Sequence, residues 1–341
     1  MTKSVPPVAV VMPVHNAAAF VTESVQSLLT QTYSAFEIIV IDDSSTDDTP
    51  HILRSFRDPR LRLFTNPTNL GVAASLNRGL TLTDAPYIAR HDADDISLPH
   101  RLSRQYSFLN DHPSYALVGS QLLTIDAQGR TLQRSPPPRP TTQGGIAWEL
   151  CTGNPFSHPT VMFRRDVVVN NLHGYDEAAN GAEDLELWHR ITRVAPATNL
   201  LEPLIRFRLH QDSVTARYRP SRFRNCITLR ARILAELAPS LGSPALSART
   251  ICALLQRPRF TSARESAAAC TFLHRLRKTF RVHNTHWHDV RLHCAVAFLR
   301  LARKTFRTFP CIAARSVAIA FVDSPSLVLR RLLAARWTPK R

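Results

Sequence analysis

The first 90 residues alternate between short apolar runs and segments with helical spacing. Continuous β-branched runs at 8–12 and 36–41 are typical of strands buried on both faces of a parallel sheet. Between these runs, apolar residues at 21–29 recur at the spacing of one helical face. We also expect a helix at 46–56, a strand at 61–64, a helix at 72–82 and a strand at 87–91. This alternation predicts a doubly wound α/β sheet, in which ligands bind at the carboxyl ends of strands.

A different pattern begins near residue 225, where apolar positions at helical spacing alternate with Arg and Lys. A Pro-rich segment at 135–142 is expected to be an extended loop. The sequence therefore predicts a domain at 1–220, with a Rossmann-like, mostly parallel sheet flanked by helices. A basic all-α region at 221–341 follows it.

The charge of the chain is concentrated in that last region. Residues 1–220 contain 20 Lys and Arg against 22 Asp and Glu, whereas 221–341 contain 23 against 4. A cationic region of this kind is suited to an anionic partner, either a membrane surface or nucleic acid, and the sign of the charge does not choose between them.

Composition narrows the class of protein. With 341 residues, 44% of them hydrophobic and 20% charged, the chain is typical of a globular protein. Its six cysteines include no C-x-x-C pair, so neither a disulfide framework nor a thiolate metal site is indicated. Neither a signal peptide nor a charge-free run of about 18 residues is found. We therefore expect a protein of the cytoplasmic side.

Acidic residues follow two of the predicted strands. Asp42 and Asp43 come after the second strand, where helix capping is the simplest role for an aspartate. A phosphoacceptor site of the response-regulator kind would need a later lysine in the same domain. The chain has no lysine between Lys3 and Lys278, which argues against that alternative.

The second acidic group is denser, with Asp92, Asp94 and Asp95 within four positions at the end of a strand. Capping of the following helix, with Ser97 as a possible cap, is the alternative role. Capping needs one acceptor, however, and three carboxylates repel one another unless they are solvated or share a cation. Carboxylate oxygens are ligands for hard cations such as Mg²⁺ or Mn²⁺, which leave positions free for substrate phosphates.

A third acidic segment, Glu183-Asp184-Leu185-Glu186, begins a predicted helix about 90 residues further along the chain. Acids in a first helical turn are favoured by the helix dipole, which is one explanation. The other is a general base that faces the metal site. His158 and His210 likewise have either a structural or a functional role.

Six motifs together resemble the inverting family 2 glycosyltransferases of the GT-A fold, over roughly residues 5–215. They are V-V-M-P-V-H-N, V-I-D-D-S-S-T-D-D-T, N-L-G-V-A-A-S-L-N-R-G-L, I-A-R-H-D-A-D-D-I-S-L-P-H-R-L, H-P-T-V-M-F-R and E-D-L-E-L-W-H-R. Many members of the family have Arg before the Asn of the third motif, whereas Leu76 precedes Asn77 here. Arg78 or Arg90 are the candidates to supply that charge.

The resemblance implies a role for each matching residue. It implies that Asp184 is the catalytic base and that a divalent ion, Mn²⁺ or Mg²⁺, is bound. The implied metal contacts are Asp94, Asp95 and His210. The implied donor-binding residues are Pro13, Val14, His15, Asp43, Asn77, Arg90 and Asp92, of which Asp43 accepts a hydrogen bond from the base.

The resemblance also implies the reaction. One sugar is expected to pass from a nucleotide-sugar donor, a UDP-sugar by family likeness, to a lipid-linked or cell-surface glycan such as lipopolysaccharide or capsule. Processive synthesis is not indicated, because the chain has no Q-x-x-R-W motif. The alternative is a non-catalytic module that binds sugar nucleotides or acts as a membrane scaffold.

The basic helices have two interpretations. Long basic amphipathic helices dock on anionic bilayers, which would place the protein peripherally on the inner face of the plasma membrane. An ordinary helical domain with a solvated basic face is the alternative. No recognised nucleic-acid motif is present, so nucleic acid is not the expected partner.

Overall fold

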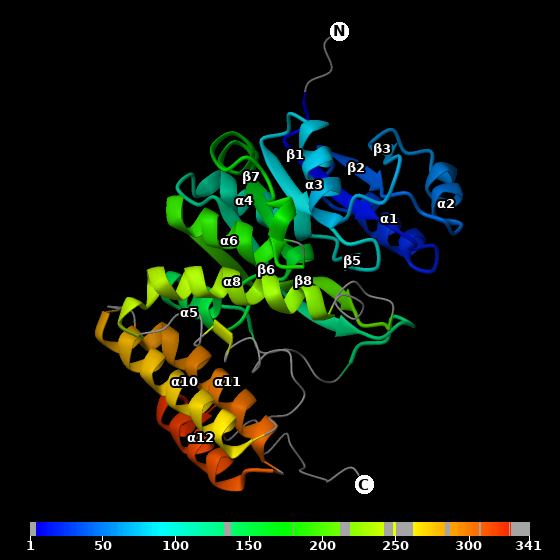
Figure 1. The fold of residues 1–341 in the computed structure, drawn as a ribbon. Helices are drawn as coiled ribbons and strands as arrows, with labels where there is room; N and C mark the ends of the chain where they lie inside the picture. The colour runs from blue at the N-terminus through cyan, green and yellow to red at the C-terminus, as the bar shows by residue number, and fades with distance from the viewer. Residues whose placement is uncertain are drawn as a thin grey trace. The chain divides into compact units, whose positions relative to one another are not determined.

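The computed structural model describes residues 5–132, 138–179, 181–211, 219–241, 248–249, 262–283, 287–306, 308–326 and 328 (Figure 1). The chain divides into two compact units. Met1–Thr141 and Phe156–Arg219 make up the first unit, and Thr142–Pro155 and Pro220–Arg341 make up the second. The second unit therefore takes in residues 142–155, which precede the boundary expected near residue 220.

An eight-stranded mixed sheet forms the first unit, in the order β3-β2-β1-β4-β7-β6-β8-β5. The strands are β1 (Val8–Val14), β2 (Phe36–Asp42), β3 (Leu61–Thr65), β4 (Tyr87–Arg90), β5 (Ile96–Ser97), β6 (Leu117–Ile125), β7 (Met162–Arg164) and β8 (Ala197–Arg208). The first four strands in this order are parallel, and β6 is parallel to β8. Strands β5 and β7 run antiparallel to their neighbours, so the predicted α/β class with a mostly parallel sheet is confirmed.

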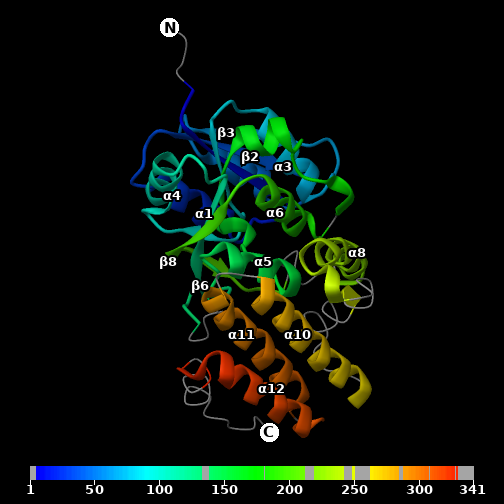
Figure 2. The same cartoon turned by 90° about the vertical axis from the view of Figure 1, so that its left-hand side faces the viewer.

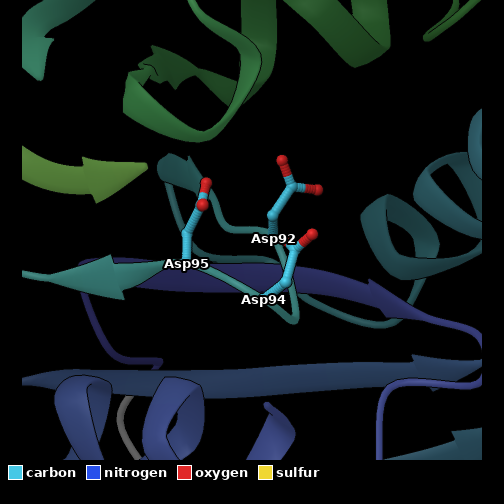
Figure 3. A group of neighbouring side chains, drawn as sticks. All are labelled: Asp92, Asp94 and Asp95. Carbon is cyan, nitrogen blue, oxygen red and sulfur yellow. The ribbon is translucent and has the colours of Figure 1, made fainter. Parts of the chain in front are cut away.

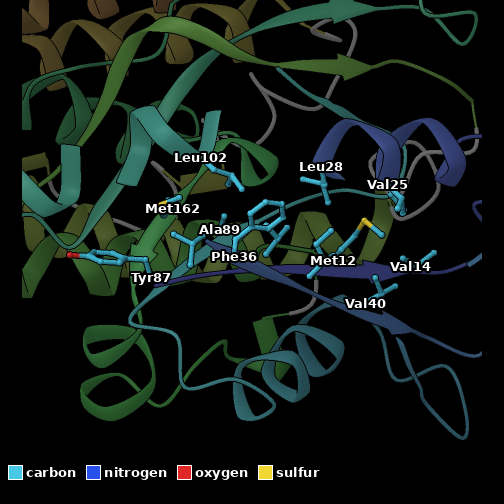
Figure 4. Close-up of a cluster of buried hydrophobic side chains, with 14 of the residues drawn as sticks. Met12, Val14, Val25, Leu28, Phe36, Val40, Tyr87, Ala89, Leu102 and Met162 are labelled. Carbon is cyan, nitrogen blue, oxygen red and sulfur yellow. The ribbon is translucent and has the colours of Figure 1, made fainter. Parts of the chain in front are cut away.

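Helices cover both faces of the parallel strands. Their bounds are α1 (Val21–Leu29), α2 (Thr49–Ser55), α3 (Val72–Thr81) and α4 (Arg101–Asp111). Alternate β1 residues such as Val10 and Met12 share a buried cluster with Val25 of α1 and Leu102 of α4 (Figure 4). On the opposite face α3 lies so close that a Cβ on Gly79 would collide with Val11. Successive β1 side chains point to opposite faces of the sheet, so this almost fully buried strand packs against helices on both sides.

One local expectation was wrong. Ser97, considered as a helix cap, lies instead in β5, where it pairs with Ile205 of β8 and its N–H donates to Ser27 Oγ at 2.9 Å. Helix α4 begins four residues later, at Arg101. The pairing partner lies more than 100 residues away, so the local sequence does not reveal it.

The rest of the first unit carries the later motifs. It comprises η1 (His158–Thr160), the short π-helix η2 (Asp166–Asn171), η3 (Glu177–Ala179) and α6 (Glu183–Val194). Helix α6 starts at the third acidic segment, as the sequence predicts.

The second unit is helical. Its elements are α5 (Gln143–Thr152), α8 (Arg219–Leu237), η4 (Pro239–Leu241), α10 (Ala263–His283), α11 (Trp287–Thr305) and α12 (Pro310–Asp323). Helices α10, α11 and α12 pack on one another (Figure 2). A buried ion pair joins two of them, since Arg277 Nε donates to Asp323 Oδ2 at 2.7 Å. Arg230 of α8 caps the C-terminal end of α5, because its guanidinium donates to the carbonyls of Leu150 and Gly153 at 2.8 and 2.5 Å. None of the described helices is both long enough and apolar enough to span a bilayer.

Candidate functional site

The candidate site lies at the carboxyl ends of the parallel strands. Strand order runs outward from β1 in both directions, with β2 on one side and β4 on the other. A reversal of this kind is the place where open α/β sheets bind ligands. Asp43 follows β2 and the three aspartates follow β4, so two of the predicted acidic groups lie at this edge.

The three aspartates after β4 form one carboxylate cluster. Single side-chain oxygens of Asp92, Asp94 and Asp95 all lie within 4.8 Å of one another. Their carboxylates point to the same side of the turn (Figure 3). The side chains of Asp92 and Asp94 are 27% and 26% exposed, whereas Asp95 is fully buried. The cluster therefore offers two accessible carboxylates above a buried one.

Asp92 is paired with a buried cation. The guanidinium of Arg90, 4% exposed, makes an ion pair with its carboxylate. Burial raises the pKa of Asp92, the Arg90 charge lowers it, and the carboxylates of Asp94 and Asp184 raise it again. Asp184 is thus near enough to Asp92 for the two charges to interact. Arg90, expected to contact the donor diphosphate, lies within the acidic cluster.

Asp95 is the most constrained member of the cluster. Its Oδ1 accepts the backbone N–H of Arg208 at 2.8 Å, while its buried Oδ2 meets no hydrogen-bond donor among the described residues. Burial, followed by the Asp92 and Asp94 charges, raises the pKa of this carboxyl well above its usual range. A buried carboxylate oxygen without a donor is costly, and a bound cation removes that cost. The cluster therefore fits a divalent metal ion.

Arg208 organises this edge of the site, and the sequence analysis missed it. The Nε atom donates to the Asp94 carbonyl at 2.8 Å and Nη1 to the Ala127 carbonyl at 3.0 Å. The Nη2 atom donates to Glu23 at 2.5 Å, and the guanidinium lies over the Phe20 ring. Its position two residues before His210 is the one clue that the sequence offered.

His210 contacts the cluster directly. Its Nε2 lies 2.8 Å from Asp94 Oδ2, and because an ionised carboxylate only accepts, the nitrogen donates in this arrangement. The ring also packs against Phe20, with centroids 4.7 Å apart. His210 therefore holds Asp94 in place, and its predicted role as a metal contact stays a prediction.

A buried polar network supports the turn from below. Ser24 Oγ donates to the Asp92 carbonyl at 3.0 Å and also lies 3.0 Å from His91 Nε2. On the other ring nitrogen, Arg101 Nη1 lies 3.2 Å from His91 Nδ1. Burial, with the Arg101 and Arg90 charges, lowers the pKa of His91 well below its usual range. A neutral ring with its proton on Nε2 satisfies these contacts together.

Asp43 already holds a loop. Its Oδ1 accepts from the Leu70 N–H at 2.8 Å and from Asn66 Nδ2 at 2.7 Å, and its Oδ2 accepts from the Gly71 N–H at 2.8 Å. A carboxylate has about four acceptor positions, so one remains for the expected contact with a base.

The end of β1 lies beside Asp43. Pro13 and Val14 pair in register with Ile41 and Asp42, and the Val14 carbonyl accepts the Asp43 N–H at 2.7 Å. His15 is exposed, and its Nδ1 lies 2.9 Å from the Asp43 carbonyl oxygen. These residues thus meet at the edge where the nucleotide was expected.

The missing arginine of the third motif has one candidate at the cluster. Arg78 Nη1 donates to the carbonyl of Thr65 at 2.7 Å and to Asn66 Oδ1 at 2.5 Å. Those contacts place Arg78 on the Asp43 side, and only Arg90 of the two candidates pairs with Asp92.

The predicted base belongs to the first turn of α6. Asp184 Oδ1 accepts the N–H of Leu185 at 2.7 Å. Nearby, the Tyr175 hydroxyl lies 3.0 Å from His158 Nε2, and the charge of Arg90 acts to lower the pKa of both groups. Burial and the Arg90 charge lower the pKa of His158 well below its usual range, so His158 is neutral. His158 and Tyr175 therefore form a neutral pair at this side of the cluster.

Asn77 was expected to contact the donor, but its amide is engaged elsewhere. Its side chain binds the backbone of Tyr175 from both sides, as donor at 3.0 Å and as acceptor at 2.8 Å. This partner lies 98 residues away along the chain, so no local pattern reveals it.

An α/β sheet with a carboxylate cluster at its topological switch point places the chain in the class of α/β proteins that bind their ligands at this edge of the sheet. The family model named Glycosyl transferase family 2 matches residues 9–171. Together with the relatives below, this match shows that the chain belongs to glycosyltransferase family 2 and is a transferase.

Two relatives illustrate the likeness in sequence. The chain is 36% identical to EpsE of Bacillus subtilis (strain 168) over 218 residues, which cover 62% of this chain and 76% of EpsE. It is 33% identical over 215 residues to the O-antigen biosynthesis glycosyltransferase WbnJ of Escherichia coli, covering 60% of this chain and 81% of WbnJ. Both alignments exceed two thirds of the relative's length.

Solved structures share the fold. TarS of S. aureus in complex with UDP-GlcNAc has a TM-score of 0.56 at 17% identity, over 94% of this chain and 91% of that one. The mannosyltransferase PcManGT of Pyrobaculum calidifontis, in complex with GDP-Man and Mn²⁺, has a TM-score of 0.54 at 19% identity, over 95% and 88%. The expected GT-A fold is thereby confirmed.

Proposed function

We propose that this protein is an inverting, metal-dependent glycosyltransferase that moves one sugar from a nucleotide-sugar donor to a lipid-linked or cell-surface glycan. The observation that carries the proposal is the carboxylate cluster of Asp92, Asp94 and Asp95, near the charge of Asp184. One buried oxygen of this cluster meets no hydrogen-bond donor in the part of the chain that the structure describes.

The cluster is the proposed metal site. Asp94 and Asp95 hold the ion, with His210 as a further contact, and Mn²⁺ is the ion named in the complex of the mannosyltransferase neighbour. When bound, such an ion neutralises the negative charge of a departing nucleoside diphosphate. The position of Asp95 Oδ2, buried and without a hydrogen-bond donor among the described residues, supports this assignment.

Asp184 is the proposed general base. It takes the proton of the acceptor hydroxyl, whose oxygen then attacks the anomeric carbon on the face opposite the leaving nucleotide and inverts it. Arg90 balances the charge of Asp92, which faces the sugar nucleotide. The neutral pair of His158 and Tyr175 adds no charge to this side of the site.

The donor binds along the strand ends in this proposal. The residues assigned to it are Pro13, Val14, His15, Asp43, Arg90 and Asp92. Asp43 keeps one acceptor position for a base N–H, as uracil would present. TarS was solved with UDP-GlcNAc and the mannosyltransferase with GDP-Man. We propose a UDP-sugar and keep GDP-sugars as the alternative that the experiment must separate.

A lipid-linked acceptor suits the second unit. Its exposed cations include Lys278 and Arg315. The charges of both lower the pKa of His274, so both lie near that side chain. Helix α12 also exposes Phe321 and Val322, 44% and 63% accessible. Exposed cations and exposed apolar side chains in the same helical unit favour docking on an anionic bilayer, where lipid-linked glycans are assembled. The O-antigen relative WbnJ supports this class of acceptor.

A hydrolysis screen tests the proposed function. The purified protein is incubated with UDP-, GDP- and dTDP-sugars in Mn²⁺ or in EDTA, and released nucleoside diphosphate is measured. We expect release from one nucleotide class, in Mn²⁺ alone. A non-catalytic sugar-nucleotide module would bind a nucleotide to saturation yet release no sugar, and that result would overturn the proposal.

A further inference from the structure

The side chain of Asn77 faces a loop and not the carboxylate cluster. Its Nδ2 donates to the Tyr175 carbonyl at 3.0 Å and to Glu177 Oε1 at 2.9 Å, and its Oδ1 accepts the Tyr175 N–H at 2.8 Å. These three bonds use both N–H donors and one of the two acceptor positions of the amide. An amide engaged in this way has no N–H left for a diphosphate.

The loop is shaped to receive that amide. Gly174, just before Tyr175, has a φ of +78°, a conformation that side chains with a Cβ disfavour. A Cβ built on Gly174 would lie 2.5 Å from Asn77 Oδ1. Both the backbone angle and the close approach therefore require glycine at this position.

Helix α6 holds the same loop from its other side. Arg190 donates through Nη1 to the Leu172 carbonyl at 2.6 Å and through Nη2 to the Gly174 carbonyl at 2.8 Å. Its Nε donates to Glu186 at 2.7 Å, within the first turns of the helix that carries Asp184. Residues 172–177 thus join α3 to the helix of the proposed base.

The other end of this connection is the nucleotide side of the site. Asp43 accepts the N–H groups of Leu70 and Gly71, which lead into α3. Asn77 lies in the middle of α3, and the Tyr175 that it holds carries the hydroxyl beside His158. The charges of Asp184, Glu183 and Asp92 all raise the pKa of Tyr175, so this tyrosine lies near both the proposed base and the cluster.

From this geometry we infer that Asn77 is a positioning residue, which fixes loop 172–177 and through it the first turn of α6 relative to the carboxylate cluster. This inference rests on the proposed function, in which Asp184 is the base. It replaces the expectation that Asn77 binds the donor. The contact between Asn77, Gly174 and Tyr175 is called the amide clamp below.

The test compares Asn77→Ala and Gly174→Ala with a matched control, Gly129→Ala. Gly129 also has a φ of +78°, but the nearest atom to its Cβ would be Arg208 Nη1 at 3.8 Å, an ordinary contact. The control therefore introduces the same backbone strain without the collision. Binding of the nucleoside diphosphate with Mn²⁺ is measured by calorimetry, and kcat and KM are measured with the donor found in the screen.

Loosening the clamp should impair the reaction and spare binding. We expect kcat to fall about 10- to 100-fold in Asn77→Ala and in Gly174→Ala, with nucleotide Kd and donor KM within about twofold of wild type, because a misplaced base slows chemistry without removing a ligand. Gly129→Ala should keep wild-type kcat. A Kd weakened about tenfold or more with kcat retained would make Asn77 a donor ligand and overturn the inference.

A second measurement does not depend on turnover. Hydrogen exchange should be faster at the Tyr175 amide and in the first turn of α6 in Asn77→Ala, and unchanged there in Gly129→Ala. Unchanged exchange in Asn77→Ala would overturn the clamp even if kcat fell as predicted. If exchange were faster in Asn77→Ala but the wild-type protein turned over no donor, the clamp would stand and the proposed function would be wrong.

Discussion

At the scale of single residues, Asp95 shows how the site accommodates its own charge. The side chain is fully buried, one oxygen receives the Arg208 amide, and the other has no donor among the described residues. Two more carboxylates lie within 4.8 Å. The buried carboxylate therefore destabilises the folded protein when no cation is bound, as is common where a site is built for a ligand.

This cost leads to a prediction for Asp95→Asn. The pKa of Asp95 is raised above the 3.8 of an ordinary aspartate, so its contribution to stability is present below about pH 4 and is lost as pH rises through the folded-state pKa. At pH 8 in EDTA the neutral amide should therefore raise Tm, by about 2 to 4 °C for each kcal/mol regained. The gain should shrink near pH 4.

Calorimetry with Mn²⁺ completes that experiment. Wild type should gain Tm on addition of Mn²⁺, and Asp95→Asn should lose most of this gain, because a ligand stabilises only the state that binds it. Asp84→Asn is the matched control, since it removes the same charge from a side chain that is 85% exposed. A lower Tm for Asp95→Asn in EDTA, or a full Mn²⁺ shift, would contradict this account.

At the scale of elements, local patterns predicted what local packing determines. The apolar run at 8–12 became β1 (Val8–Val14), because its residues are buried on both faces between helices. The helix at 72–82 and the strand at 61–64 agree with α3 and β3 to within a residue at each end. In contrast, the antiparallel pairing of β5 with β8 joins Ile96 to Arg206, and no local sequence pattern predicts it because the two residues are far apart in the chain.

The parts of the site follow the same division. Carboxylates at strand ends could be read from the sequence, because strand ends and acidic residues are both local features. Arg208, Tyr175 and the engagement of Asn77 could not, since each depends on a partner from a distant segment. The buried Arg101 is the first residue of α4, and its bonds to the Arg90 and Val161 carbonyls depend on the finished sheet.

At the scale of the whole molecule, charge and chemistry occupy different parts of the chain. Residues 1–220 are near neutral and contain the carboxylate cluster, whereas 221–341 hold 23 Lys and Arg against 4 Asp and Glu. The proposed contact with a membrane is surface docking, in which these cations face anionic headgroups. Fields of this size act on partners within about 8 to 10 Å at physiological salt.

Vesicle flotation tests the docking proposal. The protein should float with vesicles containing anionic phospholipid, less so at high salt, and not with neutral ones. The double variant Phe321→Ser/Val322→Ser should bind more weakly, while Val194→Ser, which removes an exposed apolar side chain of the first unit, should bind as wild type does. Equal flotation with neutral and anionic vesicles, or preference for added RNA over vesicles, would contradict docking.

The most direct test of the central claim is the transfer rate of Asp184→Asn beside that of Glu183→Gln, its neighbour in the same acid pair. With the donor and metal from the screen, we predict that Asp184→Asn loses about 10²- to 10⁴-fold in kcat, as expected for the loss of a general base, while its nucleotide Kd stays near wild type. Glu183→Gln should lose far less. Transfer by Asp184→Asn within about threefold of wild type, in a folded protein, would contradict the account.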